Sequence, residues 1–498
     1  MPPQLPQSRI KHVVVLMLEN RSFDHLFGFF QASLGQTIEN LRGANSNLDN
    51  LLDPSKPPSP NNPVFKVGQN APFAVHDKDG PPHSFHAVCL QLCNDPDGPS
   101  AASPVKNNGY ILAYKDDLLR RTHQIDHDQV AEVMQSFSST QLPAINQLAK
   151  EFVLCDHWFC EVPGPTMPNR MYIHAATSEG YVHNAFDRDF TSKTIYELVQ
   201  AKGLKWCTYF HDLNEVLQFK KLGHDPDNFR RFGDRWATDV SSGKLPNYVF
   251  ILPRFNNKKA AQGKPAIMAN SQHAPEDVRF GEHLIADVYD ALAANVQLFS
   301  ETVLIVTYDE HGGFYEHIAP GTAPSPDGQN SPNADDKANF QVPPFTFDRL
   351  GLRAPTLIVS PWVPEGAVLN RNLQHTSVIK TAIELFGLDG PLNHRDASAA
   401  SFADLFTQQP SPRAPNQMPN KLKRPSLDQP IVSLVAGIPV DPADEPLDTL
   451  TEEWVNGFAA IADRRTASFA RSALAVRQPR TQGEAADLIE NCLKSLGL

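Results

Sequence analysis

The sequence predicts an α/β fold in which a mostly parallel sheet is sandwiched between helices. Short continuous apolar runs recur along the chain, and amphipathic stretches alternate with them from about residue 12 to residue 406. Such runs are typical of strands buried on both faces, and their alternation with helical patterns favours crossover connections. In sheets of this kind the ligand site lies outside the carboxyl ends of the strands.

The predicted elements follow from this pattern. The apolar runs give strands at residues 13–18, 152–154, 248–252, 303–306 and 356–359. Amphipathic spacing gives helices at residues 194–201, 278–298 and 377–386. Loops rich in Asn, Pro and Gly are predicted at residues 41–74 and 319–340, either as lids beside the site or as simple insertions.

The end of the chain differs in composition from the rest. Residues 410–430 are Pro-rich and carry basic but no acidic residues between Arg413 and Arg424, as linkers often do. Residues 447–477 and 484–498 have helical apolar spacing. We therefore expect a catalytic region at residues 10–406, a linker at 407–430, and a small helical C-terminal appendage at 431–498 that packs against the core. Membrane approach is the alternative role for the appendage.

Composition excludes several classes of protein. The chain of 498 residues is 41% hydrophobic with a formal charge of -12, which describes a globular protein and argues against nucleic-acid binding. Its 6 cysteines do not form a disulfide scaffold, and no run of about 18 apolar residues predicts a membrane-spanning helix. Because residues 1–11 are polar, we expect a soluble, cytoplasmic protein with at most peripheral membrane contact; secretion of a processed form is the alternative.

Polar patches follow the buried runs at three places: Glu19-Asn20, Thr166 and Asp309-Glu310. The carboxyl ends of parallel strands meet at one edge, so we expect these patches to lie together. Carboxylate and amide oxygens suit a divalent cation such as Ca²⁺, Mg²⁺, Mn²⁺ or Zn²⁺. Each patch alone is better explained as a solvated loop, but their recurrence favours a metal site.

Thr166 has two interpretations. Pro168 follows two residues later and residues 169–179 can continue as a helix, so Thr166 is predicted to be a helix N-cap. Alternatively, it is a nucleophile at a helix N-terminus, where free N–H groups and the dipole favour a phosphate. A cation bound to its hydroxyl would lower the pKa and supply the alkoxide.

Histidines in polar loops are candidate proton donors and acceptors: His83, His211, His273 and His317. Phosphoryl transfer through a protein nucleophile needs an acid for the leaving oxygen and a base for the following water. Such proton transfers are worth about 10²–10⁴-fold in rate. A competing interpretation is a zinc site on one helical face, formed by His83, His86, Cys89 and Cys93.

Several motifs resemble the phosphoesterase family. They are residues 10–25 (IKHVVVLMLENRSFDH), 164–170 (GPTMPNR), 308–317 (YDEHGGFYEH), and 350–355 (LGLRAP) leading into 358–362 (IVSPW). This family contains the phosphatidylcholine-type phospholipases C of bacteria, the non-specific phospholipases C of plants and related acid phosphatases. It belongs to the alkaline phosphatase superfamily, and the resemblance covers roughly residues 10–405.

The resemblance implies the site residues and their roles. It implies one divalent metal held by Glu19, Asn20, Asp309 and Glu310, with Thr166 as both ligand and nucleophile. It also implies that His83 and His273 contact the phosphoryl group, with Asn169 in substrate binding and His211 as a weaker catalytic candidate. Many relatives read His-Pro-x-His-Asp where this chain has Glu276 in place of the second histidine, which leaves the acid/base assignment open. Many bacterial relatives also carry a twin-arginine export signal, which this sequence lacks.

The predicted function is therefore a metal-dependent phosphoesterase that hydrolyses phospholipids through a phosphothreonine intermediate. The alternative is an acid phosphatase acting on small phosphomonoesters, since the same constellation serves both. A protein that only binds phosphate is disfavoured because Thr166 and the four ligands are all present. A sulfatase-like hydrolase is disfavoured because sulfatases of the same superfamily need a Cys or Ser, converted to formylglycine, where this chain has Thr166. The sequence does not predict an oligomeric state.

Overall fold

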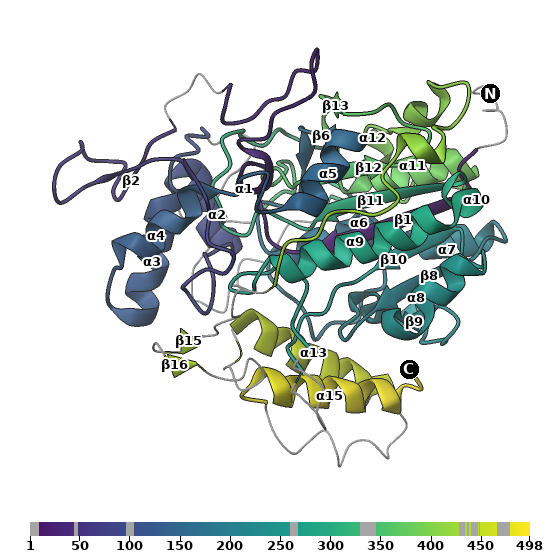
Figure 1. Ribbon diagram of the computed structural model, residues 1–498. Coiled ribbons are helices and arrows are strands. Elements are labelled where there is room, and N and C mark those ends of the chain that lie inside the picture. Colours follow the sequence, from purple (N-terminus) through teal and green to yellow (C-terminus); the bar gives the residue numbers. More distant parts are fainter. Residues whose placement is uncertain are drawn as a thin grey trace.

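A central sheet of eight strands organises the computed structural model, which describes residues 9–43, 48–95, 104–258, 267–328, 345–427, 434–435, 438–439, 447, 449–465 and 479–498 (Figure 1). The strand order is β13-β6-β12-β11-β1-β10-β8-β9. β12 pairs antiparallel with both of its neighbours, and the other strands run in one direction. The prediction of a mostly parallel α/β sheet is confirmed. The strands are β1 (His12–Leu18), β6 (Val153–Cys155), β8 (Trp206–Phe210), β9 (Phe229–Arg231), β10 (Tyr248–Ile251), β11 (Thr302–Tyr308), β12 (Thr356–Val359) and β13 (Ala367–Leu369).

The predicted strands are the fully buried ones. β1, β6, β10, β11 and β12 all lie where apolar runs predicted them, and nearly all of their residues are buried. The missed edge strands β9 and β13 are largely half-buried and three residues long: β9 (FRR) lacks an apolar run, and the run of β13 (AVL) is too short to stand out from the surrounding loop. β8 is fully buried, but its sequence WCTYF is short and mixes polar with aromatic residues.

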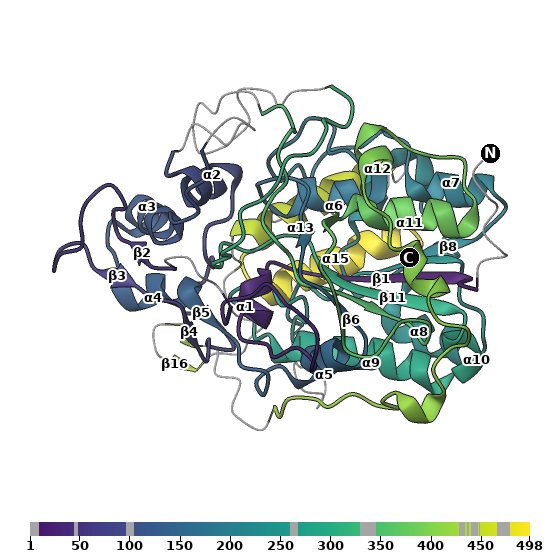
Figure 2. The same cartoon turned by 90° about the horizontal axis from the view of Figure 1, so that it is seen from above.

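Helices cover both faces of the sheet, as predicted (Figure 2). One face carries α6 (Thr166–Ala175), α7 (Ile195–Ala201), α11 (Thr376–Phe386) and α12 (His394–Ser398), and the other carries α5 (Pro143–Glu151), α8 (Phe232–Ser241), α9 (Arg279–Ala294) and α10 (Val296–Phe299). The predicted helix at 278–298 is interrupted at Asn295, which ends α9 and caps α10. Thr194 caps α7 in a reciprocal pair with Glu197, which explains where that helix begins.

The helix after Thr166 differs from the prediction at both ends. Thr166 is the first residue of α6, and Pro165 occupies the N-cap position, so the predicted capping role is wrong. The helix ends at Ala175 rather than near residue 179, with Ala176 left-handed at φ 58°. Beyond it, the Thr177 hydroxyl accepts the backbone N–H of Glu179, a local bond that competes with helix continuation.

A long excursion between β1 and β6 forms a layer at one end of the sheet (Figure 1). It has its own apolar cluster, which includes Val88, Tyr110 and Val133. Its elements are α1 (Phe23–Phe27), β2 (Asn50–Leu51), β3 (Val64–Phe65), β4 (Gly68–Gln69), α2 (Phe85–Cys93), α3 (Tyr110–Thr122), α4 (His127–Ala131) and β5 (Gln135–Ser136). Within the predicted second loop, residues 329–340 lie outside the described residues.

The C-terminal helices α13 (Thr449–Arg465) and α15 (Gln482–Ser495) lie side by side beneath the sheet in Figure 1. Residues 466–477 of the predicted first helix lie outside the described residues. The preceding Pro-rich segment runs along α9, where the Tyr289 hydroxyl donates to the carbonyl of Pro419 at 2.6 Å. The remaining strands form two small pairs: β7 (Trp158–Phe159) with β14 (Leu373–Gln374), and β15 (Leu434–Val435) with β16 (Ile438–Pro439). In the part of the chain that the structure describes, no helix is long and apolar enough to cross a bilayer.

Candidate active site

Two of the predicted polar patches meet because β1 and β11 are neighbours in register. Leu18 pairs with Tyr308, so Glu19-Asn20 and Asp309-Glu310 leave the sheet at the same height. The backbone N–H of Asn20 donates to Asp309 Oδ1 at 2.9 Å. Asn20 is left-handed at φ 57°, and a Cβ at Gly312 would lie 2.1 Å from its carbonyl oxygen. The close approach of these loops therefore requires glycine at position 312.

Thr166 completes the group from the start of α6. Its hydroxyl donates to Asn20 Oδ1 at 3.4 Å, and the residue is fully buried. Asn169 shapes the preceding loop: its side-chain oxygen accepts the N–H groups of Glu161 and Val162, and its amide donates to three carbonyls in residues 162–165. These contacts position Thr166, and the predicted contact of Asn169 with substrate stays a prediction.

Arg170 is a central residue that the sequence reasoning missed. Its Nε lies 3.2 Å from both Glu19 Oε1 and Asp309 Oδ2, and its Nη1 lies 2.8 Å from Glu215 Oε1. Burial opposes its charge, but Glu215, Glu19 and Asp309 together raise the pKa of Arg170. The signal was present, since Arg170 stands four positions after Thr166 and so shares its helical face.

Behind Arg170 lies a buried chain of polar contacts. Glu215 accepts from Arg170 and lies 3.4 Å from His174 Nε2, while His174 Nδ1 lies 3.0 Å from the Tyr196 hydroxyl. Burial lowers the pKa of His174. This arrangement fixes one side of the Arg170 guanidinium.

Aromatic rings contact Arg170 as well. Its guanidinium carbon lies 5.7 Å from the ring centroids of Phe255 and Trp454, and these two rings are 4.2 Å apart. Trp454 belongs to α13 and also stacks on Phe186 at 5.1 Å. The C-terminal appendage thus reaches the predicted site, and no local sequence pattern signals a contact between such distant segments.

His83 and His273 lie together beside Asn20. His83 Nδ1 bonds the carbonyl of Pro81 at 2.8 Å, so its Nε2 is the lone-pair nitrogen that accepts from the Asn20 amide at 3.1 Å. The two imidazole centroids are 5.9 Å apart. His273 Nε2 is buried and has no hydrogen-bond partner among the residues that the structure describes, and burial, with help from His83 and Arg21, lowers the pKa of His273 well below its usual range.

The carboxylates of the site fit a divalent cation. Oε1 of Glu310 is buried and accepts no hydrogen bond from the described residues, and Oε1 of Glu19 is met by Arg170 Nε at 3.2 Å without a hydrogen bond of good geometry. Burial, reinforced by Asp309, raises the pKa of Glu310 to about 8 although His83 opposes this, and burial also raises the pKa values of Glu19 and Asp309. Buried anionic oxygens without donors are costly, and a hard cation is the ligand that would satisfy them.

A second acidic cluster lies on α1 and the loop after β11. The side chains of Asp24, Glu316 and His317 bring their ligand atoms within 4.8 Å of one another. Arg353 already contacts this cluster, at 2.7 Å from Glu316 and 3.2 Å from Asp24. This guanidinium compensates the carboxylates, so the cluster works as an ion-pair network that ties the loop to α1.

His211 lies apart from these contacts. Its Nδ1 bonds the carbonyl of Leu252 at 2.9 Å and its ring stacks on Phe232 at 4.5 Å. Burial, with Arg254 nearby, lowers the pKa of His211 to about 3. These contacts do not join it to Thr166, and its predicted catalytic role stays a prediction.

The alternative zinc site does not form. His83 turns toward Asn20, while His86 lies 3.9 Å from Asp116. Cys89 and Cys93 belong to two different apolar clusters. The proposed ligands therefore face different surroundings, although they share one short stretch of sequence.

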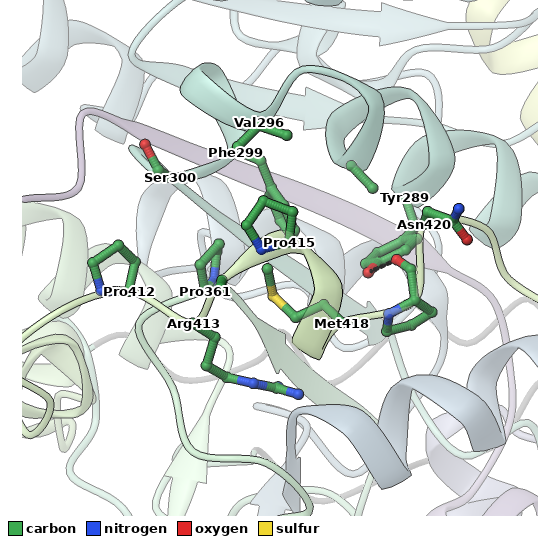
Figure 3. Close-up of a pocket in the computed structure, with 13 residues that line it drawn as sticks. Tyr289, Val296, Phe299, Ser300, Pro361, Pro412, Arg413, Pro415, Met418 and Asn420 are labelled. Atoms are coloured by element: carbon green, nitrogen blue, oxygen red, sulfur yellow. Dashed lines mark hydrogen bonds between the residues drawn. The ribbon is translucent and has the colours of Figure 1, made fainter.

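An apolar cavity lies at the opposite edge of the sheet from Thr166 (Figure 3). Its volume is about 300 Å³, and Tyr289, Phe299 and Met418 line it. Ser300 and Pro361 place it beside the amino end of β11 and the end of the antiparallel β12. It is therefore separate from the site at the carboxyl edge.

Comparison with known proteins identifies the family of the chain. The model of the Phosphoesterase family matches residues 10–389. The chain belongs to this family. It is accordingly a hydrolase that acts on phosphoester bonds, and the sequence-based recognition of the family is confirmed.

Curated relatives include two plant proteins and one bacterial protein. The chain is 34% identical over 424 residues to "Non-specific phospholipase C6" of Arabidopsis thaliana, covering 82% of this chain and 74% of the relative. It is 33% identical to "Non-specific phospholipase C1" of the same plant, covering 84% and 75%. It is 27% identical to "Phospholipase C B" of Mycobacterium tuberculosis, covering 86% and 84%.

Among solved structures, matches include a phosphonate monoester hydrolase of Agrobacterium radiobacter, with 13% identity and a TM-score of 0.30, covering 56% of this chain and 74% of that one. A Vibrio parahaemolyticus protein of the alkaline phosphatase superfamily matches at 12% identity, also with a TM-score of 0.30, covering 52% and 64%. Scores this low carry no argument.

Proposed function

We propose that this protein is a metal-dependent phosphoesterase of the phospholipase C type that works through a phosphothreonine at Thr166. The contact between the Thr166 hydroxyl and Asn20 Oδ1 at 3.4 Å carries the proposal, because the backbone N–H of Asn20 is in turn bonded to Asp309 Oδ1. The start of α6 beside it adds a favourable helix dipole for the phosphoryl oxygens.

The residues that would hold the divalent cation are Glu19, Asn20, Thr166, Asp309 and Glu310. When bound, such a cation lowers the pKa of a coordinated hydroxyl and offsets negative charge on the phosphoryl group. Which metal binds is a question for titration with Mg²⁺, Ca²⁺, Mn²⁺ and Zn²⁺.

Side chains of the protein supply the nucleophile and the proton donor of the first half-reaction. The Thr166 hydroxyl loses its proton to solvent, Oγ1 attacks phosphorus, and the bond from phosphorus to the leaving oxygen breaks. His273 is the better proton donor to that oxygen, because its Nε2 has no partner whereas both His83 nitrogens are engaged. An anionic phosphoryl group beside His273 raises its pKa and so favours the protonated form.

The second half of the reaction restores the enzyme. Water attacks the phosphothreonine, and His273, now neutral, takes the proton of that water. The bond from phosphorus to Thr166 Oγ1 breaks, and the departing oxygen takes a proton from solvent to re-form the hydroxyl. To contact a phosphoryl oxygen, His83 must carry a proton on Nε2 and release the Asn20 amide, while Nδ1 stays bonded to the Pro81 carbonyl.

The names of the relatives favour a phosphodiester substrate. The Arabidopsis and Mycobacterium proteins are named phospholipases C, and this chain is 27–34% identical to those cited above. We therefore place a phospholipid first, with release of diacylglycerol and a phosphorylated headgroup. A phosphomonoester is the alternative substrate.

The decisive experiment combines product analysis with a Thr166 variant. Phosphorus NMR on mixed micelles of phosphatidylcholine and a soluble phosphomonoester, with divalent metals present, is expected to show growing phosphocholine. Thr166→Val keeps the shape of the side chain and is expected to abolish turnover, and quenched wild-type enzyme should carry phosphate on Thr166. Thr376→Val is the matched control, since Thr376 is a buried first residue of α11. Turnover by Thr166→Val would refute the mechanism, and phosphate release from the monoester alone would make the enzyme a phosphatase.

A further inference from the structure

Arg21 is a buried cation that the proposed mechanism does not use. It follows Asn20 directly and is 1% exposed. Its Nη1 and Nη2 are both buried without a hydrogen-bond partner in the described part of the chain. Burial lowers the pKa of Arg21 to about 9. A buried, unpaired guanidinium is unfavourable for stability, so its presence calls for another explanation.

Arg21 contacts two loops of the site besides its own. Its Nε donates to the carbonyl of Gln272 at 2.8 Å. Its guanidinium carbon lies 4.6 Å from the ring centroid of Phe314, in the loop that follows Glu310. One side chain thus connects the Glu19-Asn20 turn with the loop that carries His273 and the loop after Asp309-Glu310.

The bond to Gln272 acts on the peptide group that precedes His273. The oxygen of this peptide accepts from Arg21, and its N–H, which belongs to His273, donates to Ser271 Oγ at 3.1 Å. A further bond joins the Ser271 carbonyl to the N–H of Glu19 at 2.9 Å. The orientation of this peptide plane relative to β1 therefore depends on Arg21.

The side chain of Gln272 is held in place by its own contacts, which restrict the conformation of this loop. Gln272 is left-handed at φ 70°, its amide donates to the Val278 carbonyl at 2.8 Å, and it accepts from the Tyr308 hydroxyl. A Cβ at Gly281 would lie 2.2 Å from it. Because the side chain is fixed, rotation of the following peptide is the remaining freedom, and this is the motion that Arg21 restrains.

We propose that Arg21 is a positioning residue for His273, setting where the imidazole meets the leaving oxygen of the substrate. The inference rests on the proposed function, in which His273 protonates that oxygen. Misplacement of a catalytic group by about 1 Å can cost about 10²-fold in rate. The loss of rate should be largest for substrates whose leaving oxygen is strongly basic and must be protonated as it departs.

The test uses two substrates that share a headgroup but differ in leaving group: short-chain phosphatidylcholine, with an alkoxide, and p-nitrophenylphosphorylcholine, with a good aryloxide leaving group. Arg21→Met is expected to lower kcat/KM, which reports the steps up to departure of the leaving group, at least about 10-fold on the first and under threefold on the second. In a His273→Ala background the Arg21→Met effect should vanish. Arg279→Met is the control, because Arg279 is also buried and lies 4.7 Å from a phenylalanine ring, that of Phe73.

Equal losses on both substrates, or an undiminished Arg21→Met effect in the His273→Ala background, would overturn the inference. If Arg21→Met does not fold, Arg21→Lys, which keeps the charge but loses the planar donor, carries the same comparison. These measurements distinguish a failure of the proposed function from a failure of the role assigned to Arg21. Turnover by Thr166→Val or a wild-type enzyme inactive on both substrates refutes the proposed function, whereas a leaving-group-independent effect in an otherwise active enzyme refutes only the role of Arg21.

Discussion

Replacing Trp454 by Leu tests whether the C-terminal helices support catalysis. The Trp454 ring lies 4.2 Å from Phe255, 5.1 Å from Phe186 and 5.7 Å from the Arg170 guanidinium. Truncating a buried Trp to Ala costs about 3–5 kcal/mol, and Leu should recover part of this. Loss of a desolvated cation–π contact adds about 1–2 kcal/mol. We expect a net destabilisation of about 3 kcal/mol, and hence a Tm lower by several degrees.

The activity should fall beyond what stability explains. Arg170 Nε lies 3.2 Å from both Glu19 and Asp309. Without the Trp454 ring beside it, the guanidinium is less fixed and positions both carboxylates less accurately. We expect kcat to fall about tenfold, equivalent to about 1.4 kcal/mol, at a temperature where the variant is fully folded.

Phe458→Leu provides the control for this prediction. Phe458 is buried on the same helix at 2% exposure and makes no ring contact with Arg170 among the described residues. Its loss should lower Tm without a comparable loss of kcat. A folded Trp454→Leu enzyme with unchanged kcat would show that α13 only packs against the core.

Three further predictions concern the loops and the buried acids. Gly312→Ala should lower kcat more than tenfold, because its Cβ would lie 2.1 Å from the carbonyl oxygen of Asn20. Gly243 has the same φ of +66° but open space around it, so Gly243→Ala should lower only the stability, by about 1–3 kcal/mol of backbone strain. Equal activities of the two variants would refute the clash. Affinity for Mn²⁺, measured by calorimetry, should rise between pH 6 and about 8, because Glu310 must lose its proton to bind; a flat profile would contradict this. Burial raises the pKa of Glu282 from 4.5 to about 8, so its contribution to folding stability is full below pH 4.5 and is lost as the pH rises through 8. Glu282→Gln should therefore flatten the fall of Tm over this pH range. An unchanged slope of Tm against pH would refute the assignment.

The sequence predicted those elements whose cause is local. β1 and β11 are buried throughout, so burial on both faces appears directly as an apolar run. β9, with the sequence FRR, is half-buried at two of its three residues and leaves no such trace. The two acidic patches were predictable for a related reason, since parallel neighbours in register end at one edge and bring the following residues together.

The residues that support the site were harder to predict. Arg170 shares a helical face with Thr166, but its partner Glu215 lies on a 3₁₀ turn after β8, and β8 itself was missed. Trp454 reaches Arg170 only through the docking of α13, and nothing in the sequence around either residue encodes that contact. Tertiary packing decides such pairs, whereas periodicity reports only which face of an element is buried.

The charge balance of the site gives the strongest physical reason to expect a cation. Glu19, Asp309, Glu310 and Glu215 are all buried, and Arg170 is the guanidinium among them. Four carboxylates against one guanidinium leave a net negative charge that a buried site does not sustain unaided. Protons are one remedy, and the raised pKa of Glu310 reports it. A divalent cation is the other, and it would also let an anionic phosphoryl group approach Thr166, which protonated carboxylates alone do not achieve. Protons and metal therefore compete for the same oxygens, which is why the affinity for Mn²⁺ should depend on pH where the charge of Glu310 changes.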